Sequence, residues 1–100
     1  MLKLAHYKWQ REDAHINVIC DAFPAQDEAI EQAKVWLQKI DARISDISEG
    51  ADRAQIQFVS EQDTYLLCYD GTCEALWIEV TGFAEFDSLA KLLTKLEEIQ

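Results

Sequence analysis

Apolar and polar residues alternate near the start of the chain, which is the pattern of β-strands. The apolar positions of this alternation are Ala5, Tyr7, Trp9, Ala14, Ile16, Val18 and Cys20. Residues 10–13 are polar and predict a turn between two strands. Pairing Tyr7 with Ile16, Trp9 with Ala14 and Ala5 with Val18 gathers the apolar side chains on one face. The opposite face then holds His6, Lys8, His15 and Asn17.

Two later segments have apolar residues three and four positions apart, the period of amphipathic helices. The first helix is expected over residues 24–42, with Pro24 in its first turn and Trp36 at the edge of its apolar stripe. The second begins at Asp87 or Ser88, because either side chain can cap a helix. Its apolar positions are Leu89, Leu93, Leu96 and Ile99.

The segment between the helices predicts strands over residues 53–60, 64–69 and 73–80. Residues 43–49 fit a further short strand or an extension of the first helix, and we favour the strand. A two-residue loop at 61–62 places Phe58 opposite Tyr65. A two-residue loop at Asp70 and Gly71 places Cys68 opposite Cys73, because aspartate followed by glycine favours tight hairpins.

These registers sort the strand residues onto two faces. The apolar face is expected to hold Ile56, Phe58, Tyr65, Leu67, Leu76, Ile78 and Val80 and to pack against the helices. The other face is mixed and holds Gln55, Gln57, Val59, Leu66, Cys68, Cys73, Ala75, Trp77 and Glu79. The sequence therefore predicts one α+β domain over residues 1–100, a two-layer sandwich with two helices on one face of a mostly antiparallel sheet.

Composition and charge limit the classes of function. The chain has 100 residues, of which 49% are hydrophobic, as in an ordinary folded domain. Its 9 basic and 19 acidic residues give a net charge of −10, which repels nucleic acids and anionic lipid. The order of helix, three strands and helix from residue 24 onward matches a double-stranded RNA-binding domain, but Glu85 and Asp87 stand where such domains use lysines. We therefore expect neither nucleic-acid nor membrane binding.

The 3 cysteines indicate a reducing compartment, so we expect a cytoplasmic protein. The first eight residues also lack the uninterrupted apolar segment of a signal peptide. If Cys68 and Cys73 lie opposite each other, they are a candidate redox pair that forms a strained, labile disulfide. The alternative is that both are small, weakly apolar strand residues.

No common catalytic motif, phosphate-binding loop or metal-ligand spacing occurs in the chain. We therefore expect no catalytic residue, no metal and no cofactor. Asp46, Glu49 and Asp52 near Gly50 lack the ligand order of a calcium loop and are interpreted as a solvated acidic turn. His6 and His15 are interpreted as exposed strand residues.

The mixed sheet face is the candidate binding surface, with Val59, Leu66, Cys68, Cys73 and Trp77 as its binding residues. Soluble domains rarely leave a large apolar surface uncovered, and tryptophan is enriched at binding hot spots. We expect a non-enzymatic interaction module that docks a protein partner or forms a homodimer. The net charge favours a basic partner, although solubility explains it equally well. Two alternatives stay open: the N-terminal hairpin or a helix covers this face, or Cys68 or Cys73 supports a thiol-dependent redox or hydrolytic activity.

Two short segments resemble a family of short, acidic, uncharacterised bacterial proteins. They are Gly50-Ala51-Asp52-Arg53 and Cys73-Glu74-Ala75-Leu76-Trp77-Ile78-Glu79. The resemblance implies a similar small α+β fold and a bacterial cytoplasmic origin. Because no activity is assigned to that family, it implies no catalytic residue.

Overall fold

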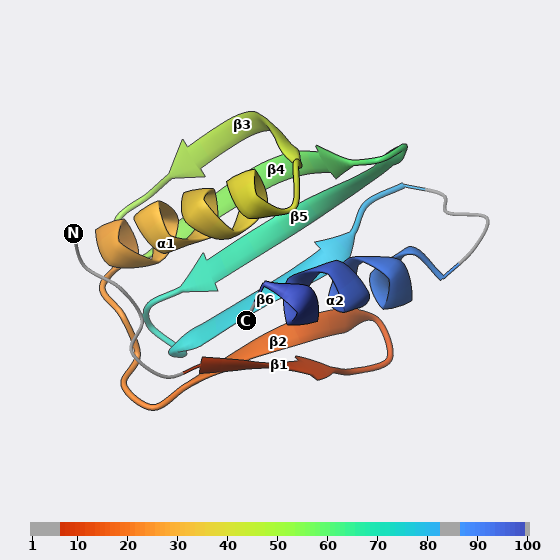
Figure 1. Ribbon diagram of the computed structural model, residues 1–100. Helices are drawn as coiled ribbons and strands as arrows, with labels where there is room; N and C mark the ends of the chain where they lie inside the picture. The colour runs from red at the N-terminus through yellow and green to blue at the C-terminus, as the bar shows by residue number, and fades with distance from the viewer. Residues whose placement is uncertain (1–6, 83–86, 100) are drawn as a thin grey trace.

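Six antiparallel strands form one sheet in the order β1-β2-β6-β5-β4-β3 (Figure 1). The structure is a computed structural model that describes residues 7–82 and 87–99. Its elements are β1 (Tyr7–Arg11), β2 (His15–Cys20), α1 (Gln26–Lys39), β3 (Arg43–Glu49), β4 (Arg53–Ser60), β5 (Asp63–Asp70), β6 (Ala75–Val80) and α2 (Ser88–Glu98). The order ββαββββα confirms the predicted α+β fold, including a strand over residues 43–49.

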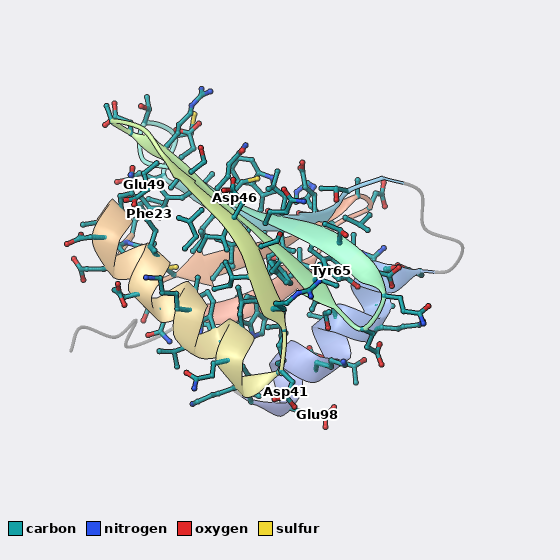
Figure 2. The ribbon with its side chains drawn as sticks, turned by 90° about the horizontal axis from the view of Figure 1, so that it is seen from above. Phe23, Asp41, Asp46, Glu49, Tyr65 and Glu98 are labelled. Carbon is teal, nitrogen blue, oxygen red and sulfur yellow. The ribbon has the colours of Figure 1, made fainter. Side chains whose placement is uncertain are left out.

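Both helices lie on one face of the sheet. α1 packs over β3 and β4, and α2 packs over β1, β2 and β6 (Figure 1). In the view from above, the two helices stay on the same side of the strands (Figure 2). The predicted helix-facing residues of β4, β5 and β6 are buried there, apart from the half-buried Val80.

The core joins these helices to the sheet. Its largest fully buried side chains are Trp36, Tyr65, Phe58, Ile16, Leu37, Ile56, Ile78, Leu92 and Leu96. Trp36, expected at the edge of the helical stripe, is only 2% exposed. Its ring lies 4.7 Å from that of Trp9 and 5.0 Å from that of Tyr7, and its indole N–H donates to the Tyr7 hydroxyl at 3.0 Å. The strand pattern could not show that the rings of Tyr7 and Trp9 on β1 would pack against Trp36 and cover this edge.

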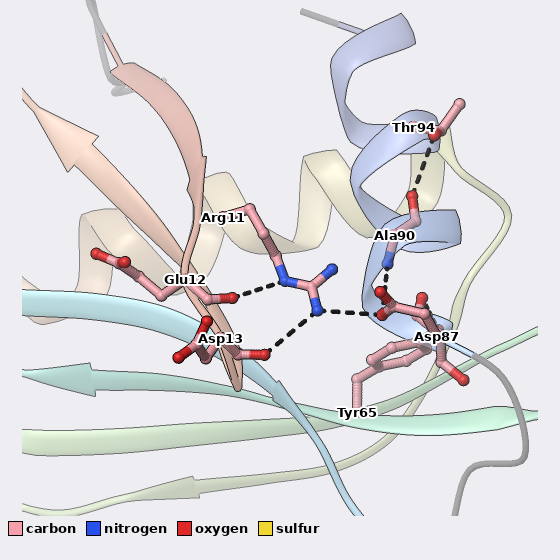
Figure 3. Close-up of polar contacts among 8 residues, drawn as sticks. Arg11, Glu12, Asp13, Tyr65, Asp87, Ala90 and Thr94 are labelled. Carbon is pink, nitrogen blue, oxygen red and sulfur yellow. Dashed lines mark hydrogen bonds and ion pairs between the residues drawn. The ribbon is translucent and has the colours of Figure 1, made fainter.

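The register predicted for the first hairpin is wrong by four residues. Tyr7 lies opposite Cys20 and Trp9 opposite Val18, because β1 continues through the expected turn to Arg11. The Arg11 guanidinium donates to the carbonyls of Glu12 and Asp13 and pairs with Asp87 at 3.1 Å (Figure 3). These contacts hold a polar residue at the end of the strand. An even shift leaves the paired side chains on their predicted faces, but Ala14, expected on the apolar face, lies exposed in the turn before β2.

The two helices begin differently, because α2 has a side-chain cap and α1 has none. α1 begins at Gln26, two residues after Pro24, with Ala25 as its N-cap residue and Asp27 and Glu28 in its first turn. Asp87 caps α2 as predicted, and its carboxylate accepts the backbone N–H of Ala90 at 3.3 Å (Figure 3).

The hairpin of β4 and β5 has the predicted register, with Phe58 opposite Tyr65 and Ser60 opposite Asp63. The hairpin of β5 and β6 does not. Asp70, rather than Tyr69, is the last paired residue, and it lies opposite Ala75. The strand predicted at 73–80 therefore begins at Ala75, after a turn of residues 71–74.

Candidate functional site

The sheet face that points away from the helices is the candidate site, and we call it the outer face. Alternation along the paired strands assigns side chains to it. Its residues are Lys8, Gln10, His15, Asn17, Ile19, Arg43, Asp46, Ser48, Arg53, Gln55, Gln57, Val59, Thr64, Leu66, Cys68, Asp70, Ala75, Trp77 and Glu79. In the ranges 7–82 and 87–99, no helix or strand packs on it (Figure 2). The N-terminal hairpin extends the sheet beside β6 and does not cover this face.

Trp77 lies on β6, between β2 and β5. Asn17 is opposite it on β2 and Cys68 is opposite it on β5. Its indole N–H donates to the carboxylate of Glu79 at 3.1 Å, two residues along the same strand. The side chain is half-buried, so the hydrogen bond fixes the ring while part of its surface stays accessible.

The turn between β5 and β6 is built around Asp70. Its carboxylate accepts the backbone N–H groups of Thr72 and Cys73 at 3.0 and 3.1 Å. Arg53 of β4 lies 3.5 Å from the same carboxylate. The N–H of Cys73 first, and then Arg53, lower the pKa of Asp70. These bonds explain why the chain forms a four-residue turn instead of the two-residue loop that Asp70 and Gly71 predicted.

This turn separates the two predicted partner cysteines. Cys68 is buried in β5 opposite Trp77, whereas Cys73 is exposed in the turn. The register that would have placed them opposite each other is therefore wrong, and it gives no support to a cross-strand disulfide. Burial, and then the nearby Glu79 carboxylate, raise the pKa of Cys68 to about 11. The Cys68 thiol is thus protonated at neutral pH.

A cleft of about 450 Å³ opens beside Trp77. Its volume is in the range of small ligand pockets. The lining residues are Ser48, Glu49, Gly50, Arg53, Ala54, Gln55, Cys68, Tyr69, Asp70 and Trp77. The two turns that bound it are joined by a hydrogen bond of 2.7 Å from the Gly71 N–H to the Asp52 carbonyl. The sequence predicted Cys68 and Trp77 as site residues but not this hollow, because the hollow depends on how the turns of two hairpins meet.

Ile19 is an outer-face residue that sequence reasoning missed. It is 40% exposed, and no other large hydrophobic side chain in the described ranges is exposed. Its alternation with Val18 and Cys20 indicated the outer face. The pattern did not show that β2 would join β6 and bring Ile19 close to Trp77. Of the other predicted residues, Val59 and Leu66 lie on this face and are half-buried.

Among the described residues of the first hairpin, His15 and Cys20 lie on opposite faces of the sheet. His15 lies on the outer face opposite Glu79, while His6 lies outside the described residues. Cys20 is half-buried on the helix side, where burial and then Asp21 raise the pKa of its thiol. No cluster of three or more histidine, cysteine or acidic side chains that could hold a metal ion occurs in the described ranges.

The outer face differs from the rest of the chain in charge. Three of its residues are acidic (Asp46, Asp70 and Glu79) and three are lysine or arginine (Lys8, Arg43 and Arg53). The whole chain has 19 acidic and 9 basic residues. The net charge of −10 therefore resides away from the outer face, on the helices, turns and remaining positions.

A family model described as "Protein of unknown function (DUF3630)" matches residues 6–98. The chain belongs to the DUF3630 family. This confirms the predicted membership of an uncharacterised family, and the family description assigns no site to this DUF3630 protein. No curated protein and no solved structure matches it. None of its described helices is long and apolar enough to cross a membrane.

Proposed function

We propose that this protein is a non-enzymatic interaction module that docks the surface of another protein molecule on its outer face. The observation on which this rests is the uncovered sheet face around Trp77, with the exposed Ile19 on one side and the cleft on the other. Apolar side chains surrounded by little net charge are typical of the centre of protein interfaces. Tryptophan beside a preformed hollow is typical of a hot spot.

The charge of the outer face defines the chemistry of its partner. Three acidic and three basic side chains attract neither a strongly basic nor a strongly acidic surface. We therefore infer a partner surface that is apolar at its centre and close to neutral. The basic partner that the net charge favours stays a prediction.

The thiol-dependent alternative finds no support in the site. A nucleophilic or redox cysteine needs a lowered pKa, because the thiolate is the reactive form. The pKa of Cys68 is raised to about 11 instead, and Cys73 does not lie opposite it.

The experiment is affinity capture from the source cell's lysate with three forms of the chain: wild type, Trp77→Glu and Thr94→Glu. Thr94 is exposed on α2, so Thr94→Glu adds the same charge on the helix side and serves as the matched control. Unfolding curves first establish that each variant is folded. We expect a protein, or a second copy of the chain, to be retained by wild type and by Thr94→Glu but lost with Trp77→Glu.

Direct binding between the purified components then measures the loss, which we expect to be at least about tenfold in Kd. Binding that survives Trp77→Glu unchanged, with equal profiles for all three forms, would exclude the outer face as the docking surface.

A further inference from the structure

We propose that the cleft beside Trp77 receives an arginine side chain of the protein that docks on the outer face. The inference rests on the proposed docking function and names the chemistry of the partner at one position. A partner surface that is close to neutral over the whole outer face can still present one arginine at the cleft. The assignment rests on the shape of the cleft, the charge around it and the chemistry of its walls.

The shape of the cleft follows from one row of residues across the sheet. Cys68 lies opposite Trp77, and Gln55 lies opposite Cys68. Ser48 continues the row on β3, opposite Gln55. Neighbouring strands are about 5 Å apart, so Trp77 on β6 and Gln55 on β4 are separated by about 10 Å. The small Cys68 side chain lies between them, and the cleft of about 450 Å³ that they line is large enough for the planar end of an arginine side chain.

The end of the sheet that holds the cleft is acidic. The turn of residues 50–52, the turn of residues 71–74 and the first turn of α1 lie together at this end (Figure 1). Backbone and side-chain hydrogen bonds join the three segments. Their charged side chains are all acidic, namely Asp27, Glu28, Asp52 and Glu74. This end therefore attracts a cation, although the charges on the strands of the outer face are balanced.

Two residues that line the cleft lie in this negative potential. Burial first, and then the carboxylates of the three acidic segments, raise the pKa of Tyr69. Burial, and then the Glu79 carboxylate, raise the pKa of Cys68 to about 11. Arg53 also lines the cleft, but it pairs with Asp70 at 3.5 Å, so its charge is largely offset there. The cleft therefore favours a positive group over a negative one.

The walls of the cleft suit arginine better than lysine. A guanidinium group is planar, so it can stack on the Trp77 ring while its N–H groups donate in its own plane. The side-chain oxygens of Gln55 and Ser48 are the acceptors on the facing wall. The Trp77 indole N–H donates to the Glu79 carboxylate at 3.1 Å, which adds negative charge beside the ring that the cation meets. A lysine ammonium group is more strongly hydrated and does not stack.

NMR titration of the full chain with a capped glycine–arginine–glycine peptide tests the cleft. The control is the same peptide with citrulline, which keeps the shape of arginine and lacks its charge. We expect the Trp77 indole N–H signal to shift and saturate at about millimolar arginine peptide. The citrulline peptide should bind at least about fivefold more weakly, and a lysine peptide should also bind more weakly. Shifts that do not saturate, or equal binding of either control peptide, overturn the inference.

Two variants test whether the arginine peptide binds in the cleft. Trp77→Leu removes the aromatic ring without adding charge and should weaken binding at least about fivefold, once unfolding curves show that it is folded. Asp52→Asn removes one charge at the cleft end and should weaken binding about two- to threefold. Asp13→Asn is the matched control, because it removes the same charge from the exposed turn between β1 and β2, at the opposite end of the sheet (Figure 1). Equal effects of Asp52→Asn and Asp13→Asn would mean that net charge alone attracts the peptide, and would overturn the site.

The capture experiment separates this inference from the docking function. If Trp77→Glu loses a captured partner but the arginine peptide does not bind, this inference fails and the docking function stands. If Trp77→Glu loses nothing, the docking function fails and so does the inference that rests on it.

Discussion

Two tyrosine hydroxyl groups of β5 attach the helices to the sheet. The Tyr65 hydroxyl donates to the Ser88 carbonyl at 2.9 Å, at the first residue of α2. The Tyr69 hydroxyl donates to the Pro24 carbonyl at 2.8 Å, just before α1. Both bonds are buried, so each satisfies a carbonyl that has lost access to water. The same strand therefore fixes where both helices begin.

Tyr65→Phe removes one of these bonds and is expected to lower the free energy of unfolding by about 1 kcal/mol at neutral pH. Burial, and then the Asp63 carboxylate, raise the pKa of Tyr65 to about 12. A folded-state pKa above the unfolded value stabilises the fold below about pH 10, and this stabilisation is lost as the pH rises toward about 12. The stability difference between wild type and Tyr65→Phe should therefore narrow over this alkaline range. Urea unfolding at a series of pH values measures it, and a difference that stays constant would contradict the assignment.

The raised pKa of Cys68 gives a second prediction at this scale. With a pKa of about 11, about one Cys68 thiol in a thousand is ionised at about pH 8. We expect alkylation of Cys68 by iodoacetamide to be at least about a hundredfold slower in the folded chain than in urea. Mass spectrometry of the labelled peptides measures the rate for each cysteine. Equally fast labelling of Cys68 in both states would restore the thiol hypothesis.

At the scale of elements, hydrophobic patterns predicted the strands, the helices and their faces, but only one of three hairpin registers. The β4–β5 register was correct because Glu61 and Gln62 form the short loop that the pattern required. The other two registers were wrong by four residues, because polar side chains extended the pairing. Arg11 did so through carbonyl contacts and Asp70 through backbone N–H groups. Periodicity cannot detect such contacts, and it tolerates an even shift without moving any side chain to the other face.

α2 shows how far an element depends on the sheet. It has 11 residues, fewer than an isolated helix needs to be stable in water. Its stability therefore comes from packing, and Leu96 is one of its fully buried residues. We expect Leu96→Ala to lower the free energy of unfolding by about 2–5 kcal/mol. The exposed Thr94→Ala on the same helix should change it by less than about 0.5 kcal/mol. Thermal or urea unfolding compares them, and equal effects would mean that α2 does not pack as described.

At the scale of the whole molecule, the net negative charge lies away from the outer face, which holds Trp77 and Ile19. The sequence correctly predicted the strand position of Trp77 on the outer face, and it favoured a basic partner, which stays a prediction. The sequence could not show that acidic and basic side chains are equal in number on the outer face. This equality depends on the positions of β1 and β3 at the two edges of the sheet. Lys8 on β1 and Arg43 on β3 join the outer face only in this strand order. The value of −10 describes the chain, not its candidate binding surface.

This separation determines how salt should act on self-association. If the molecule docked on the outer face is a second copy of the chain, the −10 of each copy repels across the assembly. Raising the ionic strength from about 0.01 M to about 0.15 M shortens the Debye length from about 30 to about 8 Å and screens this repulsion. We therefore expect dimerisation to strengthen several-fold over this range, as measured by sedimentation equilibrium. Binding of a basic partner would show the opposite sign, because salt screens an attraction between unlike charges. A dimer that weakens with salt would mean that ion pairs, not the apolar centre around Trp77, hold the copies together.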